Sequence, residues 1–510
     1  MRSSIERPAP EPTSFVGGGN VGGVERRVGR ASTIERRPTE GVQSRFGWTA
    51  LVGAYAIPLL LWVSSAPVDV RFATPFASAA SIAIICALLG TTGFALNLVL
   101  GARLRWVEAM FGGLGPMYAA HRTNGQLAFV LLAGHVALIL VSRATVSPGA
   151  ALALLAPSAG WTVFAGVVAI AAMTVAIGLT VFARLGHEVF VYVQRTFGFT
   201  FVVAAYHVFT TEGAKASSPA LEWYMAGVAT MGLAAFGYRS LFSSLLVRRS
   251  RYSVEAVHRL DRSVTEIVMN PGQRQLEFQP GQFVFVSFRS ATLAARFKPF
   301  EISRGTVSIR PGEITNQFHP FSITSAPHEG ALRITVKAVG DYTSALRELE
   351  PGAEAIVEGP YGSFTHRSAV TGRHVWIAGG IGVTPFLSMA RSLRRGELES
   401  VDLYYCVETA AEALFLDELR AIAAGHAGFR VSLIARDEVG FITASVIRAE
   451  TEDLRSRDVY VCGPPAMIMS LRAQFTDEGV PAERIHAEEF SFARVGGRHR
   501  GIPHGRAGQA

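Results

Sequence analysis

Cysteine is scarce in this chain of 510 residues, which has only Cys86, Cys406 and Cys462. Three widely separated thiols are too few for a disulfide framework or a zinc site. Charged residues are also few, at 17%, against 49% hydrophobic residues. That balance is too apolar for a wholly soluble enzyme and too polar for a membrane bundle alone, so two kinds of region are expected in one chain.

The sequence also lacks the patterns of a nucleic-acid-binding surface and of a secretory signal. The net charge is +8, but the second half of the chain has no basic face interleaved with aromatic residues, so nucleic acid is not an expected partner. Residues 1–45 have few apolar side chains and contain eight Arg against five Glu, which predicts a disordered basic tail. The first long apolar run follows this polar segment and further runs follow it, so we do not expect a secretory signal.

Long apolar runs alternate with short loops from residue 46 to residue 247, and each run reaches the roughly 20 residues that cross a bilayer. Arginines are concentrated in alternate loops and in the exit segment 247–251, so the positive-inside rule places both termini in the cytoplasm, on a plasma or inner membrane. The sequence therefore predicts a multi-pass protein in the lipid bilayer, built on a six-helix transmembrane bundle. Its spans are expected at 46–66, 75–101, 122–142, 159–183, 188–209 and 221–247.

The remaining sequence predicts two soluble domains. Short β-branched runs separated by Pro-Gly turns, at 271–272 and 280–281, favour an antiparallel β-barrel over 250–368. From 369 to 495, strand-like runs alternate with helical stretches at 412–424 and 465–478, the pattern of an α/β domain with a parallel sheet. Such a sheet binds nucleotides at the carboxyl ends of its strands. Residues 496–510 are expected to be a flexible tail.

Two stretches in these domains are candidate binding sites. In "AGGIGVTP", Gly379, Gly380 and Gly382 remove side chains where a strand turns into a helix, so backbone amides can approach a pyrophosphate. The spacing is not G-x-G-x-x-G, and a glycine-rich turn also occurs without a nucleotide. In "HPFSITSAP", an aromatic beside Pro and a hydroxyl fits a flat ring, and Lys337 with the nearby Gly-Asp-Tyr-Thr turn suits phosphates. The same residues also suit an ordinary barrel strand and its turns.

Six motifs occur in one order: "HPFSIT", "VGDYT", "GPYG", "GGIGVTP", "VCGPPAM" and "IHAEEFSF". The series resembles the ferric reductase and NADPH oxidase superfamily, whose cytosolic half is a ferredoxin-reductase-like flavoprotein module. The resemblance covers about residues 100 to 492. It implies an enzyme, an NAD(P)H-dependent flavocytochrome oxidoreductase with FAD, a nicotinamide coenzyme and b-type haem. The segment 289–316 departs from the family as an apparent insertion.

The resemblance implies roles for matching residues. Phe321 lies against the flavin ring and Ser322 near the nitrogen that receives hydride, while Cys462 and Phe490 lie near the flavin and nicotinamide. The chain continues 20 residues beyond Phe490, which leaves its covering role open. No residue acts as a general acid or base. The implied FAD residues are His319, Pro320, Phe321, Ser322, Thr324, Lys337, Gly340, Tyr342 and Thr343. The implied NAD(P)H residues are Gly379, Gly380, Gly382, Thr384, Pro385, Glu408, Cys462, Gly463 and Pro464.

Coenzyme choice depends on the residue that follows the second strand of the α/β domain. Family members that prefer NADPH commonly have Arg there, and this chain has Glu408. A carboxylate repels the 2′-phosphate but accepts a hydrogen bond from a ribose hydroxyl. NADH is therefore favoured over NADPH, although Arg436 or the arginines of 391–395 could reverse the preference.

Histidines within the apolar runs are candidate haem ligands. His121 and His135 are 14 residues apart, which is about 40° from whole helical turns with a rise of about 21 Å, so they share one helix face at two depths. Two stacked haems need one ligand at each of two depths on the same helix face. An ionisable side chain within a membrane span is costly, so a functional role is the default hypothesis for it. Two histidines hydrogen-bonded to neighbouring helices are the alternative. His207 is the expected partner of His135 at the outer level.

The inner level has no evident second histidine. Family members place it 13 residues before the outer one, and here that residue is Gln194. His187 is 20 residues before His207, about 200° around the helix, and faces nearly the opposite way. Three hypotheses remain: His121 binds an inner haem with Gln194 as a weak or water-bridged ligand, a distorted helix brings in His187, or the inner site holds no haem.

The sequence thus predicts electron transfer from cytosolic NAD(P)H through FAD and one or two b-type haems to an acceptor on the far side, with ferric-chelate reduction favoured. Oxygen, with superoxide as product, cupric ion and a quinone are compatible acceptors. The alternative is a membrane-anchored flavoprotein that passes electrons to a soluble partner or quinone.

Overall fold

The computed structural model describes residues 40–183, 187–211, 218–290, 300–303, 306–309, 318–394, 396–451 and 453–489. The predicted tails 1–45 and 496–510 lie outside this part of the chain, except for the backbone of residues 40–45. Most of the 289–316 segment is also outside it. Two short strands of that segment are described, β4 (Phe300–Ser303) and β5 (Thr306–Ile309), and they pair antiparallel.

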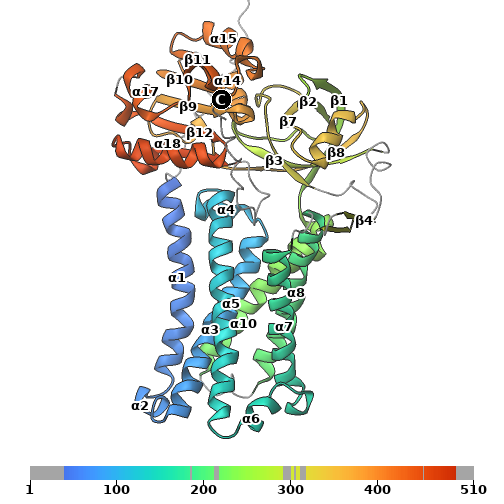
Figure 1. The fold of residues 1–510 in the computed structure, drawn as a ribbon, viewed down its shortest axis with the longest axis vertical. Coiled ribbons are helices and arrows are strands. Elements are labelled where there is room, and N and C mark those ends of the chain that lie inside the picture. The colour runs from blue at the N-terminus through green and yellow to red at the C-terminus, as the bar shows by residue number, and fades with distance from the viewer. Residues whose placement is uncertain are drawn as a thin grey trace, which may run out of the picture. The chain divides into compact units, whose positions relative to one another are not determined.

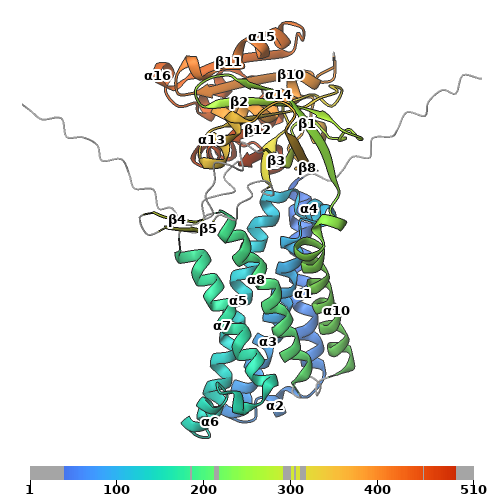
Figure 2. The same ribbon diagram turned by 90° about the vertical axis from the view of Figure 1, so that its right-hand side faces the viewer.

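Long apolar helices form a bundle in which they run side by side (Figures 1 and 2). Within the described residues, four stretches are long and apolar enough to cross a membrane: Phe46–Ser64, Pro75–Gly101, Leu114–Ala144 and Trp161–Phe182. Helices also occupy the last two predicted spans and pack into the same core, but the count of six spans stays a prediction. The helices are α1 (Glu40–Ser64), α3 (Pro75–Gly101), α5 (Leu114–Ala144), α7 (Trp161–Phe182), α8 (His187–Thr210) and α10 (Pro219–Phe236).

Two boundaries of the bundle differ from the sequence expectation. Residues 102–121, predicted as a loop, contain α4 (Arg105–Phe111) and the first turns of α5. Gly112 ends α4 in the left-handed conformation at φ 76°, which allows the chain to turn sharply into α5. The sixth helix ends at Phe236 rather than 247, and a π-helical turn (Gly237–Leu241) and α11 (Ser243–Leu246) follow.

The first soluble domain is a six-stranded antiparallel sheet that nearly closes into a barrel. Its strand order is β6-β3-β8-β1-β2-β7, and a bridge between Ile323 and Ile334 joins the chain after β6 to the other edge strand, β7. Ile267, Val286 and Phe288 point into the core. The strands are β1 (Arg249–Arg259), β2 (Val264–Pro271), β3 (Phe283–Arg289), β6 (His319–Ser322), β7 (Leu332–Lys337) and β8 (Glu354–Tyr361).

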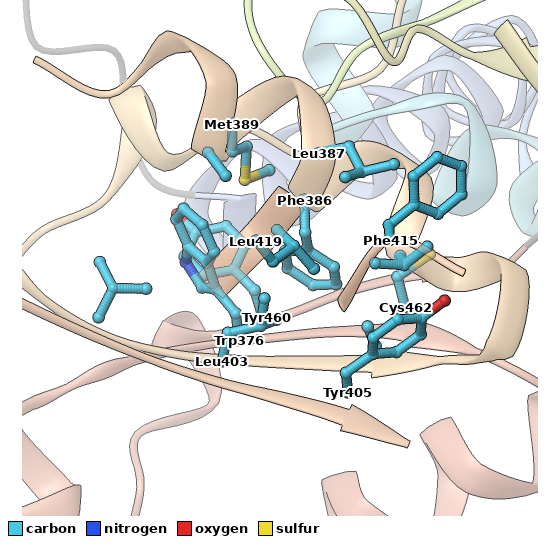
Figure 3. Packing of buried hydrophobic residues seen from close by; sticks show 14 of the residues in the cluster. Trp376, Phe386, Leu387, Met389, Leu403, Tyr405, Phe415, Leu419, Tyr460 and Cys462 are labelled. Carbon is cyan, nitrogen blue, oxygen red and sulfur yellow. The ribbon is translucent and has the colours of Figure 1, made fainter. Parts of the chain in front are cut away.

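The second soluble domain has a five-stranded parallel sheet of order β11-β10-β9-β12-β13. Its strands are buried on both faces, as parallel strands usually are. Trp376 of β9 packs in one core with Phe386 of α14 (Figure 3), whereas Ile377 packs in the opposite core with Leu471 of α18. The strands are β9 (Arg373–Gly379), β10 (Ser400–Val407), β11 (Phe429–Ala435), β12 (Asp458–Gly463) and β13 (Ile485–Glu489). The main helices are α14 (Thr384–Ser392), α15 (Leu416–Ala424), α17 (Ala444–Glu450) and α18 (Pro465–Asp477).

Candidate functional site

The two glycine-containing motifs of the α/β domain meet at its carboxyl edge. Strands β9 and β12 are neighbours, and the sheet order reverses between them, which is where doubly wound sheets bind ligands. A Cβ atom on Gly382 would lie 2.2 Å from the carbonyl oxygen of Cys462, and one on Gly379 would lie 2.8 Å from Cδ of Pro464. Side chains at these glycines are therefore excluded, and the backbones of the two motifs are in direct contact.

A cavity of about 230 Å³ opens beside this turn, between the barrel and the α/β domain. Asp261 and Lys337 line it from the barrel, and Gly380, Tyr405 and Glu412 line it from the α/β domain. Gly380 has φ +56°, and a Cβ atom there would meet nothing within 4 Å, so the turn faces open space. The cavity therefore lies where the glycine-rich turn of the α/β domain meets the barrel.

The other residues of the predicted coenzyme set surround the same turn. Thr384 and Pro385 begin α14 directly after it, and Gly463 and Pro464 follow Cys462 at the end of β12. Cys462 is fully buried, and burial raises the pKa of its thiol well above the usual value. Cys462 therefore remains a neutral thiol at physiological pH, so its side chain packs in the core and does not act as a nucleophile.

The predicted FAD residues gather at the β6 edge of the barrel. The rings of His319 and Tyr342 stack with centroids 3.8 Å apart at 23°. Ser322 and Thr324 are buried, and within the described residues their hydroxyl oxygens have no hydrogen-bond partner. Buried hydroxyls are normally satisfied, so two such groups beside one another fit a polar ligand such as the flavin.

Of the other predicted FAD residues, Lys337 ends β7 and lines the cavity described above, and the rest lie on β6 or at the short helix α13 (Asp341–Ala345). Pro320 and Phe321 pair with β3, opposite Phe285 and Val284 respectively. Gly340 precedes α13, and its N–H donates to Oγ1 of Thr343 at 3.1 Å. Phe490 lies outside the described residues.

Glu408 follows β10 at the carboxyl edge, as predicted. Its carboxylate is 3.1 Å from the Arg436 guanidinium, and both side chains are about half exposed, at 52% and 50%. Arg391, one of the arginines considered for the 2′-phosphate, instead binds Glu418 through two nitrogens at 2.6 and 2.9 Å. Arg436 is therefore positioned beside Glu408, whereas Arg391 is engaged elsewhere.

The three membrane histidines share one hydrogen-bond pattern. Nδ1 lies near a main-chain carbonyl of another helix in each case: His121 to Asn97 at 3.1 Å, His135 to Ala83 at 2.9 Å and His207 to Thr162 at 2.8 Å. A carbonyl only accepts, so Nδ1 must bear the proton and Nε2 presents its lone pair. That arrangement fixes the ring and the tautomer of a metal-binding histidine.

His135 lies on α5 and His207 on α8. Gly166 on α7 makes room for the second ring, because a Cβ atom there would lie 2.9 Å from Nδ1 and Cε1 of His207. This donor set, with two Nε2 lone pairs from α5 and α8, fits the axial ligation of a haem iron. No cluster of three or more His, Cys, Asp or Glu side chains suited to a metal ion occurs in the described part of the chain.

The inner level is less complete. His121 lies inside α5, and Gln194 lies on α8 with a partly buried side chain. His187 is the first residue of α8, and only its backbone is described. His121 is therefore the one histidine of the inner level whose side chain the structure describes.

Sequence reasoning missed a polar network beside His121. The Tyr55 hydroxyl donates to Oδ1 of Asn124 at 2.8 Å, and Nδ2 of Asn124 donates to Oδ1 of Asn97 at 3.2 Å. A Cβ atom on Gly93 would lie 2.1 Å from the Tyr55 hydroxyl, and one on Gly125 would lie 2.9 Å from Nδ2 of Asn97. The signal available in the sequence was two asparagines inside apolar runs.

Contacts between α4 and the "GPYG" turn were also missed. The Gly362 N–H donates to Oε1 of Glu108 at 2.9 Å, and the Ser363 hydroxyl donates to the carbonyl of Gly112 at 2.7 Å. Glu358, which is 1% exposed, pairs with Arg239 at 2.7 Å. The first two contacts hold the barrel against α4, and the third holds it against the π-helical turn after α10. Helix α4 immediately precedes α5, which contains His121.

Comparison with known proteins gives three family matches. "Ferric reductase like transmembrane component" matches residues 86–205, "FAD-binding domain" matches 305–365 and "Oxidoreductase NAD-binding domain" matches 376–473. The FAD match includes β6, β7 and β8 of the barrel, and the NAD match includes most of β9 and all of β10, β11 and β12 of the α/β sheet.

Individual relatives match the soluble half. The ferredoxin–NAD(+) reductase component of the alkene monooxygenase system of Xanthobacter autotrophicus is 31% identical over 256 residues, which is 48% of this chain and 70% of that protein. NADH-cytochrome b5 reductase 1 of Pyricularia oryzae is 27% identical over 199 residues, 35% of this chain and 63% of that protein. Among solved structures, flavohaemoglobin from Malassezia yamatoensis gives a TM-score of 0.43 at 21% identity, covering 81% of this chain and 97% of that one.

Proposed function

Because the chain belongs to the ferric reductase and NADPH oxidase superfamily and is an NAD(P)H-dependent oxidoreductase, we propose that it moves electrons across the membrane to an acceptor on the far side. In this proposal residues 46–247 form the haem-binding membrane domain, 250–368 bind FAD and 369–495 bind the coenzyme. With six spans both termini lie on the same side, and the arginines of alternate loops favour the cytoplasm for that side. Bound FAD supplies the change from two-electron hydride chemistry to single electrons, and bound haem supplies one-electron transport.

The chain's own residues bind and position these groups. The backbone N–H groups of residues 379–384 donate to the coenzyme diphosphate, and Glu408 selects NADH by binding ribose. Ser322 and Thr324 donate to the flavin, while Phe321 lies against it. No side chain transfers a proton in the chemical step, so the protein contributes orientation and exclusion of water.

One observation supports haem most directly: His135 and His207 each donate Nδ1–H to a carbonyl of a different helix, at 2.9 and 2.8 Å. Nε2 of each ring is then the atom that binds iron. At the inner level we propose His121 as the ligand, with Gln194 as a weak or water-bridged partner. A carboxamide oxygen binds iron more weakly than imidazole, so this site should have an altered spin state and potential.

Haem and FAD content of three purified proteins tests the proposal. The wild type should contain FAD with one or two b-type haems. His207→Ala should lose one haem but retain FAD and its bleaching by NADH, which also shows that the variant is folded. His258→Ala, on the exposed part of β1, is the matched control and should keep full haem. Full haem in His207→Ala would contradict the outer site.

Ferric chelate is the acceptor that the proposal favours, because the membrane match is to a ferric reductase like component. Superoxide formed by oxygenated vesicles with NADH, and abolished by His135→Ala, would instead identify oxygen as the acceptor. Reduction of a quinone, with neither ferric chelate nor oxygen reduced, would show that the acceptor lies within the bilayer.

A second candidate function is supported by Gln194. Without an inner histidine partner, electrons would leave at the flavin, and the bundle would act as an anchor. Relatives named as reductase components, such as that of the alkene monooxygenase system, suggest a protein acceptor for this case. A fragment of residues 250–510 that retained all activity with the natural acceptor would establish this alternative.

A further inference from the structure

Helix α14 is tied to the strand proposed to hold the flavin by two side chains one turn apart. The Ser388 hydroxyl donates to the carbonyl of Ser325 at 2.7 Å, and Nη1 of Arg391 donates to the carbonyl of Thr324 at 2.8 Å. Thr324 and Ser325 follow β6 directly. The same helix begins at Thr384, where the glycine-rich turn ends. One helix therefore connects the proposed coenzyme turn to the proposed flavin strand.

The rest of the Arg391 guanidinium is also engaged. Nε and Nη2 bind the two carboxylate oxygens of Glu418 on α15 at 2.6 and 2.9 Å, and Nη2 lies 3.8 Å from Glu266 on β2. Glu418 belongs to the α/β domain and Glu266 to the barrel, so the cation links both. The Arg391 side chain is only 10% exposed. Charge-assisted and partly buried contacts of this kind hold a fixed geometry better than exposed ion pairs do.

Close packing beside Arg391 leaves little room for the two domains to shift. Gly281, in the turn before β3, has φ +90°, and a Cβ atom there would lie 2.4 Å from Cε of Met389 on α14. Met389 is fully buried, and Figure 3 shows it at the domain core with Phe386 and Leu387 of the same helix. The helix thus contacts the barrel through its side chains as well as through hydrogen bonds.

We infer that Arg391 is a positioning residue for hydride transfer. By joining Glu418 of the α/β domain to the Thr324 carbonyl of the barrel, it sets the distance between the coenzyme turn and the flavin strand. This inference rests on the proposed function of the two soluble domains. Hydride transfer depends steeply on alignment, and a displacement of about 1 Å can cost about 100-fold in rate. Arg391 does not touch the coenzyme turn, so coenzyme affinity should change little.

Anaerobic stopped-flow mixing of the full-length protein with NADH, and with NADH deuterated at the transferred position, tests the inference. Arg391→Gln should slow flavin reduction at saturating NADH by about 10- to 100-fold, with a full isotope effect and a Kd for NADH within about threefold of the wild type. Arg391→Lys should be intermediate, since an ammonium cannot bind Glu418 in two places and reach Thr324 as well. Arg448→Gln, which breaks an Arg–Glu pair 2.8 Å long inside the α/β domain, should have no effect.

Flavin reduction at the wild-type rate in Arg391→Gln would overturn the inference. If Arg391→Gln loses FAD, Arg391→Lys and Glu418→Gln replace it, and wild-type hydride rates in both would equally overturn it. The readout is independent of haem and of the far-side acceptor. Absence of NADH-dependent bleaching in the wild type would contradict the proposed function instead, so the two failures are distinguishable.

Discussion

Glu408 and Arg436 form the residue pair that should decide coenzyme choice. Glu408→Ser removes the carboxylate that repels a 2′-phosphate and releases Arg436, now held at 3.1 Å, to bind that phosphate. The ratio of kcat/KM for NADPH to that for NADH should rise by about tenfold or more, which is about 1.4 kcal/mol. Steady-state reduction of ferricyanide measures the ratio. Glu438→Ser, an exposed residue of the short helix α16 (Arg436–Val439) that contains Arg436, should leave the ratio unchanged.

Motifs in the sequence name candidate residues of the site, but they do not name the partners of those residues in the structure. The spacing of His121, His135 and His207 identified the candidate ligands, because helical geometry relates sequence distance to depth. The carbonyl groups that fix their tautomers come from other helices, and sequence spacing contains no information on helix pairing. For the same reason Arg391 was weighed as a phosphate ligand, whereas Glu418 and Thr324 occupy it.

At the scale of elements, α7 must approach α8 closely at Gly166. Gly166→Ala would place a Cβ atom 2.9 Å from the His207 ring and displace it. We expect loss of the haem held by His135 and His207, with FAD content unchanged. Gly178→Ala lies on the same helix, where a Cβ atom meets nothing within 4 Å, and should keep its haem. Pyridine haemochrome spectra compare the two variants, and equal haem in both would contradict the predicted contact.

The amino ends of β9, β12 and β13 enclose a histidine whose protonation should destabilise the α/β domain. Burial lowers the pKa of His374 to about 4, although the hydrogen bond that Nε2 donates to the Thr371 carbonyl acts in the opposite direction. Nδ1 accepts a hydrogen bond from Trp376 at 3.3 Å. The unfolded chain binds a proton below about 6.5 and the folded chain does not, so the free energy of unfolding falls as pH falls from about 6.5 to about 4. The loss should approach about 3 kcal/mol.

Thermal unfolding followed by flavin fluorescence between pH 7 and pH 5 measures this loss. His374→Gln can still donate and accept but cannot be protonated, so its Tm should fall less steeply with pH. The pKa of Asp458 is lowered beside His486, so protonation of this carboxylate at lower pH also decreases the free energy of unfolding. If the Tm of the wild type and the Tm of His374→Gln fall equally steeply with pH, another group is responsible for the loss of stability.

Elements with strong periodicity were predicted well, and their junctions were not. Residues 75–101 form one helix, as expected from an uninterrupted apolar run with Pro75 at its start. Helix α4 was missed because its residues, Arg105 to Phe111, have no long apolar period, and its stability comes from packing of Val107 and Phe111 against the barrel residues Phe285 and Tyr361. Tertiary contacts of this kind are not visible in a local pattern.

For the whole molecule, the account predicts that electrons enter on the side of the soluble domains and leave on the other. The ferric reductase-like membrane component and the FAD- and NAD-binding domains were readable from the motif series and from composition. The number of haems was not, because Gln194 occupies the position where the family has histidine, and only loading with haem reveals whether it binds iron.

Proteoliposomes that contain ferricyanide inside and receive NADH outside test transmembrane transfer most directly. The wild type should reduce the enclosed ferricyanide, since its outward-facing soluble domains take electrons from NADH and His135 and His207 hold the haem that passes them inward. His207→Ala should still show flavin bleaching by NADH but should leave the enclosed ferricyanide oxidised. Reduction inside the vesicles at the wild-type rate by His207→Ala would contradict the account.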